Sequence, residues 1–143
     1  MSKGKYSLSF LNGALELAVR MSVNMGLDDA VVFSLPKEGL IEAFKKEFRC
    51  QKFPLELEEA DISLKEALRD FLCIGPDSAE LSEKLAELTE RHFGKTEKIC
   101  YPREYGKFRD NIGGRNGPFY NISDVFFAFM PEEVLCFFSG NFE

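Results

Sequence analysis

The last stretch of the chain, residues 121–142, constrains the fold more than any other segment. Phenylalanines stand on both sides of Met130-Pro131-Glu132-Glu133, a sequence typical of a turn. We therefore expect a β-hairpin whose cross-strand pairs are Phe129 with Val134, Phe127 with Cys136 and Val125 with Phe138. Phe126, Ala128, Leu135 and Phe137 would share the opposite face.

Both faces of this expected ribbon are apolar, and a two-stranded ribbon alone is not stable in water. Both faces therefore have to be covered. The chain's own helices can cover one face, and the other calls for a further layer or a partner. A homodimer through the hairpin face is one hypothesis that follows from this pattern.

Helical periodicity appears in two segments before residue 50. The first apolar stripe, which Gly26 follows, consists of Leu11, Ala14, Leu15, Ala18, Met21 and Met25. Residues 28–33 fit either a short strand or a helical turn. Ser34-Leu35-Pro36 is typical of a helix start, and the helix expected after it carries Leu40, Ile41, Phe44 and Phe48.

Two further helices are expected between residues 63 and 94, after a loop over residues 51–57. Ser63 and Glu66 form a capping box, and Gly75-Pro76 ends the third helix. Asp77 and Glu80 repeat the start signal for a fourth helix, and Gly94 ends it. The apolar stripe of this fourth helix consists of Leu81, Leu85, Leu88 and His92.

These patterns predict an α+β fold in a single domain, residues 1–143. About four N-terminal helices, over residues 1–94, would pack on a small C-terminal antiparallel β-sheet that contains the hairpin, over residues 95–143. Ile99-Cys100-Tyr101 is a candidate for a further short strand. A hydrophobic content of 45% and a charged content of 29% are those of an ordinary globular chain.

The charge of the chain bears on its partners. The net charge is −6, which argues against nucleic acid, because phosphate contacts require basic surfaces. Acidic residues concentrate between residues 56 and 91. On the fourth expected helix, the candidates for an acidic surface that meets a basic protein partner are Glu80, Glu83, Glu87 and Glu90. A solvated helix face is the alternative reading.

The segment 103–120 has the composition of an anion-binding loop. Glycine can turn successive backbone N–H groups toward an anion, and basic and aromatic side chains surround the glycines. The candidate binding residues are Arg103, Tyr105, Lys107, Arg109, Gly113, Gly114, Arg115 and Tyr120. Their spacing matches neither a P-loop nor a dinucleotide-binding motif. A turn-rich loop leading into an edge strand is the alternative.

No catalytic or metal-binding signature is present, and we expect no catalytic residues, no metal and no cofactor. The four cysteines show no C-x-x-C spacing, which favours a reduced, cytoplasmic protein. His92 is the single histidine, and its place on an apolar stripe favours a structural role. No apolar run approaches the roughly 18 residues of a membrane span.

The run Pro102-Arg103-Glu104-Tyr105-Gly106-Lys107-Phe108, with Gly113-Gly114 and Phe119-Tyr120 after it, carries a resemblance. It resembles the Pro-x-x-Tyr-x-x-Phe, Gly-Gly and aromatic pattern of the cell-wall-assembly-regulator superfamily. Many members of that superfamily are bacterial immunity proteins. The resemblance covers residues 102–120 only and implies no site residue.

Two function classes follow from the sequence. The favoured one is a small acidic cytoplasmic protein-binding module without catalysis, of which an immunity- or antitoxin-like inhibitor of a basic toxin is the sharpest version. The alternative is an anionic small-molecule-binding or enzymatic domain that uses the Gly/Arg-rich loop, residues 107–118. Ligand-induced thermal stabilisation would distinguish the second from the first.

Overall fold

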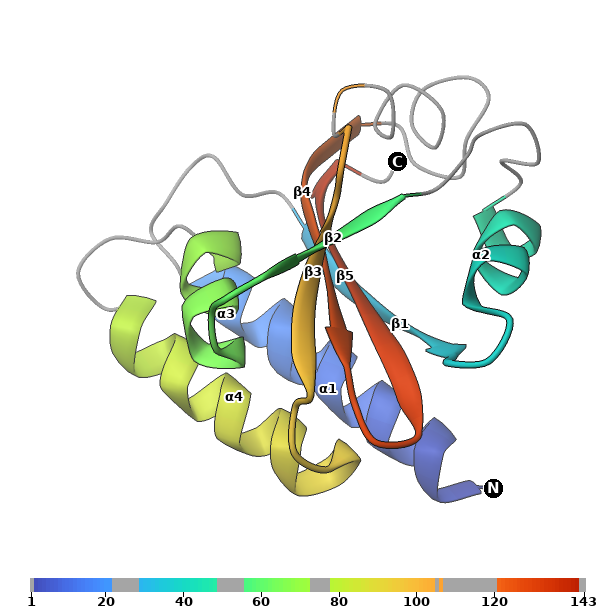
Figure 1. The fold of residues 1–143 in the computed structure, drawn as a ribbon. Coiled ribbons are helices and arrows are strands. Elements are labelled where there is room, and N and C mark those ends of the chain that lie inside the picture. Colours follow the sequence, from blue (N-terminus) through green and yellow to red (C-terminus); the bar gives the residue numbers. More distant parts are fainter. Residues whose placement is uncertain are drawn as a thin grey trace.

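The computed structural model describes residues 2–21, 29–48, 56–72, 78–104, 106 and 121–141. In these residues, four helices and a five-stranded antiparallel sheet form an α+β fold (Figure 1). The elements in chain order are α1 (Ser2–Met21), β1 (Asp29–Pro36), α2 (Leu40–Phe48), β2 (Leu57–Ala60), α3 (Leu64–Leu72), α4 (Ser78–Phe93), β3 (Lys98–Pro102), β4 (Asn121–Phe129) and β5 (Glu133–Asn141). The α+β class is confirmed. The expected separation into N-terminal helices and a C-terminal sheet is wrong, because β1 and β2 lie among the helices.

The C-terminal hairpin has the register expected from the sequence. Val125 pairs with Phe138, Phe127 with Cys136 and Phe129 with Val134. At the turn, the Met130 N–H donates to the Glu133 carbonyl over 2.8 Å. In the strand order β1-β5-β4-β3-β2, the two hairpin strands occupy inner positions, with β1 on one side of them and β3, followed by β2, on the other.

Helices of the same chain cover both faces of the hairpin (Figure 1). The face with Phe126, Ala128, Leu135 and Phe137 packs against α1, α3 and α4, and we call it the three-helix face. The face with Val125, Phe127, Val134, Cys136 and Phe138 packs against α2, and we call it the one-helix face. The second covering layer expected from the sequence is therefore α2.

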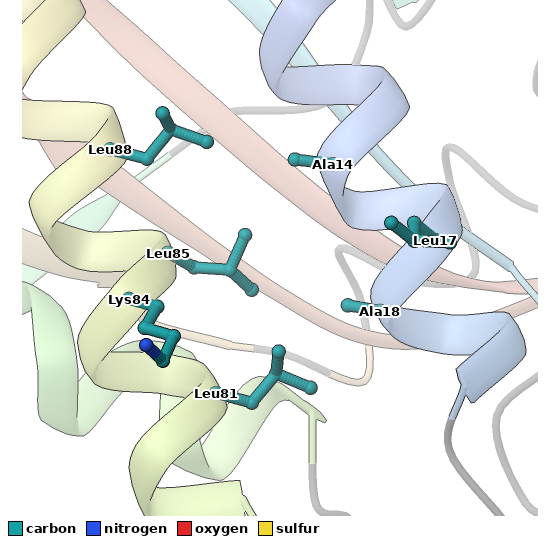
Figure 2. A pocket seen from close by; sticks show the side chains of 7 residues that line it. All are labelled: Ala14, Leu17, Ala18, Leu81, Lys84, Leu85 and Leu88. Atoms are coloured by element: carbon teal, nitrogen blue, oxygen red, sulfur yellow. The ribbon is translucent and has the colours of Figure 1, made fainter.

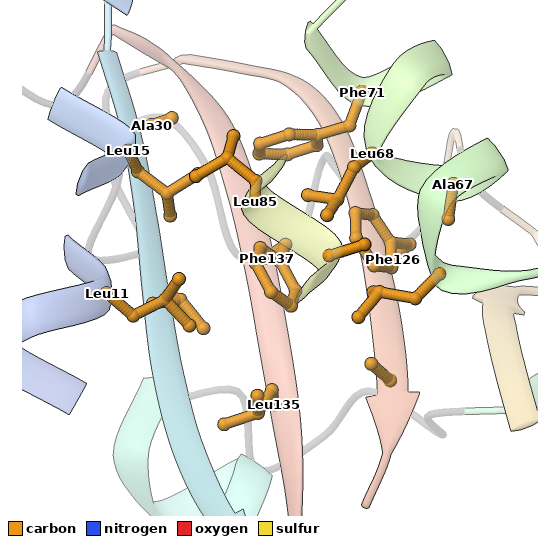
Figure 3. Close-up of a cluster of buried hydrophobic side chains, with 14 of the residues drawn as sticks. Leu11, Leu15, Ala30, Ala67, Leu68, Phe71, Leu85, Phe126, Leu135 and Phe137 are labelled. Carbon is orange, nitrogen blue, oxygen red and sulfur yellow. The ribbon is translucent and has the colours of Figure 1, made fainter. Parts of the chain in front are cut away.

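Aromatic contacts order the three-helix face. The rings of Phe126 and Phe137 lie on neighbouring strands and stack at 4.5 Å with an interplanar angle of 6°. Phe71 of α3 meets both rings edge-on, at 5.4 and 6.0 Å between centroids. Figure 3 shows Phe71 over these two strands, with Leu11 and Leu15 of α1 beside them. Such edge-to-face and stacked pairs add roughly 0.5–1.5 kcal/mol each beyond the area that they bury.

The one-helix face depends on the phenylalanines of a short helix. The rings of Phe44 and Phe48 in α2 lie 4.6 Å apart, and both are fully buried. Phe44 contacts Phe127 at 5.8 Å between centroids, and Phe48 contacts Phe138 at 5.3 Å. This confirms the helix that was expected to carry Leu40, Ile41, Phe44 and Phe48.

The helix start expected at Ser34-Leu35-Pro36 is wrong, because these residues end β1. Pro36 is tolerated there because it is the last residue of β1, which is an edge strand of the sheet. The helix begins later, at Leu40, directly after Gly39. Gly39 has φ of 71°, a conformation that favours glycine.

Segment 57–60 corrects a second expectation, since β2 begins within the expected loop 51–57 and continues through Glu58 and Glu59. The acidic side chains are exposed, and pairing with β3 holds the segment extended. Sequence periodicity gave no sign of a strand this short. Residues 51–55 themselves lie outside the described part of the chain.

The expected boundaries of α3 and α4 are confirmed where the structure describes them. The Glu66 N–H donates to Ser63 Oγ over 3.2 Å, and the Ser63 N–H donates to Glu66 Oε1 over 3.1 Å. These bonds form the expected capping box. The bond from the Ser63 N–H, and next the one that Ser63 Oγ donates to Glu66 Oε1 over 3.1 Å, lower the pKa of Glu66. Gly94 ends α4 with φ of 95°, and a Cβ there would meet Pro131 at 2.8 Å. Gly75-Pro76 and Asp77 lie outside the described residues.

The free edge of β1 is satisfied by a side chain of α1. Asn12 Oδ1 accepts from the Val32 N–H over 2.8 Å, and Asn12 Nδ2 donates to the Val32 carbonyl over 2.9 Å. Asn12 thus occupies the two backbone groups that another strand would use at this position. An unpaired edge is a template for aggregation, and Asn12 closes part of it.

Candidate protein-interaction surface

An open apolar groove of about 170 Å³ separates α1 from α4. It exists because Ala14 and Ala18 on α1 are too small to fill the space opposite the leucines of α4. Figure 2 shows the leucine side chains of α4 reaching toward α1 across this space. The lining residues are Ala14, Leu17, Ala18, Leu81, Lys84, Leu85 and Leu88.

Two large apolar side chains on α1 extend the groove to the surface. Leu17 is 59% exposed and Phe10 is 46% exposed, and they are the large hydrophobic residues exposed in the described part of the chain. They lie two helical turns apart with Ala14 between them, so all three share one side of α1. Clustered apolar exposure of this kind marks interaction surfaces more often than scattered single residues do.

His92 closes the end of the groove near the C-terminus of α4. Its Nδ1 lies 3.2 Å from the Oγ of Ser7, which is buried on α1. Its ring lies 5.1 Å from that of Phe10. These contacts join α1 to α4, as expected of a histidine with a structural role.

The exposed edge of α4 beside the groove alternates in charge. Glu80, Lys84, Glu87 and Arg91 follow one another at helical spacing, and all four are exposed. None of them has an ion-pair partner among the residues that the structure describes. Lys84 also lines the groove, so this charged edge borders the apolar strip.

The structure divides the four glutamates predicted as an acidic surface. Glu80, Glu83 and Glu87 are exposed, as required. Glu90 is half-buried, and its Oε2 accepts a hydrogen bond from the Thr96 N–H over 2.9 Å. Glu90 therefore fixes the connection between α4 and β3, a role that its place in a helical pattern did not reveal.

Neighbouring elements carry further exposed acids. β2 contributes Glu58 and Glu59, Asp61 follows it, and α3 contributes Asp70. We use the name acidic surface for Glu58, Glu59, Asp61, Asp70, Glu80, Glu83 and Glu87. Glu59 lies on its border, because side chains alternate along β2 and Glu59 shares the one-helix side of the sheet with Leu57. None of the seven is in an ion pair within the described ranges.

Of the predicted anion-binding residues, the structure describes one. Arg103 is exposed, and its Nη1 lies 4.0 Å from Glu56 Oε2. The others, which lie outside the described residues, are Tyr105, Lys107, Arg109, Gly113, Gly114, Arg115 and Tyr120. An anion site in this loop stays a prediction.

The buried polar groups do not form a catalytic constellation in the part of the chain that the structure describes. Burial raises the pKa of the Cys100 and Cys136 thiols, which makes both poor nucleophiles. Burial, together with Asp124 and Asp70, raises the pKa of Tyr101 to about 12. No group of three or more His, Cys, Asp or Glu residues that could hold a metal occurs among the described residues.

The described helices also bear on a membrane location. None of them combines the length and the apolar character that a membrane crossing requires.

Sequence reasoning missed Phe10 and Leu17. Both lie off the α1 stripe that was expected to face the core, and large apolar residues outside such a stripe are the signal that could have found them. Comparison with family models, curated proteins and solved structures found no significant match to this chain. Function therefore has to be inferred from the surfaces described above.

Proposed function

We propose that this protein is a small acidic cytoplasmic module that binds a basic protein and performs no catalysis, as an immunity- or antitoxin-like inhibitor does. The observation that carries the proposal is the acidic surface. Its seven carboxylates are exposed on β2, α3 and α4 without ion-pair partners among the described residues. Carboxylates without partners keep their full charge available to a binding protein.

The physical role of such a surface is steering and selection. Like charges gathered over neighbouring elements raise the rate of encounter with a partner of opposite sign and disfavour acidic competitors. Both effects weaken with salt, because exposed charges are screened over about 8–10 Å at physiological ionic strength. The proposal therefore predicts a complex whose association is sensitive to salt.

A paired pull-down from the native host tests the proposal. The baits are the wild type and a variant with Glu58→Gln, Glu59→Gln, Asp61→Asn and Glu83→Gln. None of these four side chains makes a hydrogen bond or ion pair in the described structure. We expect the wild type to recover a basic protein in stoichiometric amount. The variant should lose most of it, and so should the wild type in about 0.5 M salt.

Two results count against this function. One is that the wild type recovers no stoichiometric partner. The other is that the recovered partner binds the neutralised variant as well as the wild type, which would move the binding surface elsewhere. Matching circular dichroism spectra of the two baits exclude unfolding as the cause of a loss.

A further inference from the structure

The groove between α1 and α4 is an interaction surface distinct from most of the acidic surface. It joins apolar side chains of two helices, Leu17 on one side and Leu81 and Leu88 on the other. Phe10, which is also exposed, lies two turns before Leu17 on the same side of α1. The part of the chain that the structure describes places nothing over Leu17, which is 59% exposed. The charges on its α4 border indicate what kind of molecule could cover it.

That border carries the order Glu80, Lys84, Glu87, Arg91 with spacings of four, three and four residues. A basic helix laid along it would meet repulsion at Lys84 and Arg91. An acidic helix would meet repulsion at Glu80 and Glu87. The partner that matches the border is one whose charges alternate in the complementary order.

A second copy of α4, running antiparallel, has that complementary order. A two-fold axis midway between Lys84 and Glu87 places Lys84 of each copy opposite Glu87 of the other. The same axis places Glu80 opposite Arg91. A parallel arrangement would instead set each charge against its own copy, so the pattern selects the antiparallel one.

We propose that two copies of this chain form a homodimer through the α1–α4 groove, with the two α4 helices antiparallel about this axis. The four charged residues pair across the interface. Because the rotation leaves the groove sides of both copies on the same side of the dimer, Leu81 of one copy lies nearest to Leu88 of the other, and Leu17 and Phe10 are covered beside them.

This interface differs from the hairpin-mediated homodimer that the sequence suggested. Residues Val125–Ala128 and Val134–Phe138 are buried within the chain by helices on both faces, so this part of the hairpin has no free face to offer. The dimer shares Glu80 and Glu87 with the acidic surface. The other five carboxylates of that surface, Glu58, Glu59, Asp61, Asp70 and Glu83, make no pair in the dimer and remain for the basic partner proposed above.

Charge-reversal variants test the dimer. Sedimentation velocity at about 1 to 100 µM protein measures how strongly each variant dimerises. We expect the wild type to dimerise. Lys84→Glu alone sets a carboxylate against Glu87 of the other copy at two symmetric positions, and Glu87→Lys alone sets two ammonium groups together. Each single variant should raise the dimer dissociation constant by at least about tenfold.

The double variant Lys84→Glu/Glu87→Lys restores opposite charges across the axis and should dimerise again. Leu17→Glu, which puts a charge into the apolar strip, should give a monomer. Lys46→Glu on α2 is the matched control, since Lys46 is exposed and α2 lies on the opposite side of the sheet. It should leave the dimer unchanged.

A wild type that stays monomeric over the whole range would overturn the proposal. So would a dimer that survives Leu17→Glu, or a double variant that stays monomeric while its circular dichroism spectrum and thermal melt match those of the wild type. None of these results bears on the basic partner, because the pull-down variant leaves Leu17, Lys84 and Glu87 intact.

Discussion

The three-helix face of the sheet is covered largely by aliphatic side chains from α1, α3 and α4, whereas the one-helix face depends on α2, a helix of nine residues. On the one-helix face, aromatic rings take the place of the missing helices. Phe44 and Phe48 of α2 pack on Phe127 and Phe138 of the sheet, and Phe33 of β1 adds edge contacts at 5.2 and 5.8 Å.

The comparison shows how a short helix can close a sheet face. A helix of nine residues is marginal in water by itself, so packing has to supply most of its stability. Each phenylalanine buries a large area with two side-chain torsions. The one-helix face should therefore be the more sensitive of the two to the loss of a single ring.

Phe44→Ala should lower the stability of the protein more than any other substitution considered below. Phe44 is fully buried between Phe48 and Phe127, and its removal leaves a cavity under the only helix on this face in the described structure. We expect a loss of about 3–5 kcal/mol in the free energy of unfolding, measured by urea titration. Lys46→Ala, at an exposed position of the same helix, should cost less than about 0.5 kcal/mol. A loss below about 1 kcal/mol for Phe44→Ala would mean that α2 does not anchor this face.

Asn12→Ala tests how α1 holds the edge of the sheet. The substitution leaves the Val32 N–H and carbonyl without their partners, which now lie at 2.8 and 2.9 Å. We expect a loss of about 1–3 kcal/mol in the free energy of unfolding, because unsatisfied backbone groups are costly. Ser9→Ala, on the exposed side of α1, is the control. Equal stability of the two variants would show that water hydrogen-bonds the Val32 N–H and carbonyl as well as Asn12 does.

Ser63→Ala tests the start of α3 on the three-helix face. It removes the cap of α3, with an expected loss of about 1 kcal/mol. Because hydrogen bonds from Ser63 lower the pKa of Glu66 in the folded state, this stabilisation is complete above the ordinary value of 4.5 and disappears as the pH falls through the lowered value. Thermal melts of variant and wild type should therefore differ less in acid, because the bond from the Ser63 hydroxyl to the Glu66 carboxylate is lost there, while alanine keeps the backbone N–H bond to that carboxylate. A difference that is constant with pH would rule out a contribution from the bond between the hydroxyl and the carboxylate.

Asp124→Asn should change the stability of the protein least, and it should raise stability where the other substitutions lower it. Burial raises the pKa of Asp124, so the folded protein binds this proton more tightly than the unfolded chain does. Its contribution to stability therefore falls as the pH rises from 3.8 through the raised value. Asparagine keeps the acceptor for the Val125 N–H, now at 2.8 Å, without the charge. We expect a gain below about 1 kcal/mol in thermal melts at neutral pH, and a loss there would contradict the assignment.

The hairpin could be predicted from sequence residue by residue, because alternation over β4 and β5 and a Pro-Glu turn fix the register locally. β1 and β2 could not. Ser34-Leu35-Pro36 has the pattern of a helix start, and β2 begins in a segment that was expected to be a loop. Both segments become strands through pairing with residues far along the chain, β1 with β5 and β2 with β3.

The candidate surfaces also contain features that the local sequence predicts and features that only tertiary packing decides. Exposure of Glu80, Glu83 and Glu87 followed from the helical period, which is local. The groove did not, since Leu81, Leu85 and Leu88 form one apolar stripe in the sequence and only the packing of α1 decides which part of that stripe stays open. Glu90 likewise reads as a surface residue until its bond to Thr96 is seen.

Native-state hydrogen exchange tests most directly the central claim that helices of the same chain cover both faces of the hairpin. In the wild type, we expect amides in β4, β5 and α2 to be protected together, and Phe44→Ala to lower their protection together. If α2 exchanges freely while β4 and β5 stay fully protected, the one-helix face does not need its helix and the claim fails.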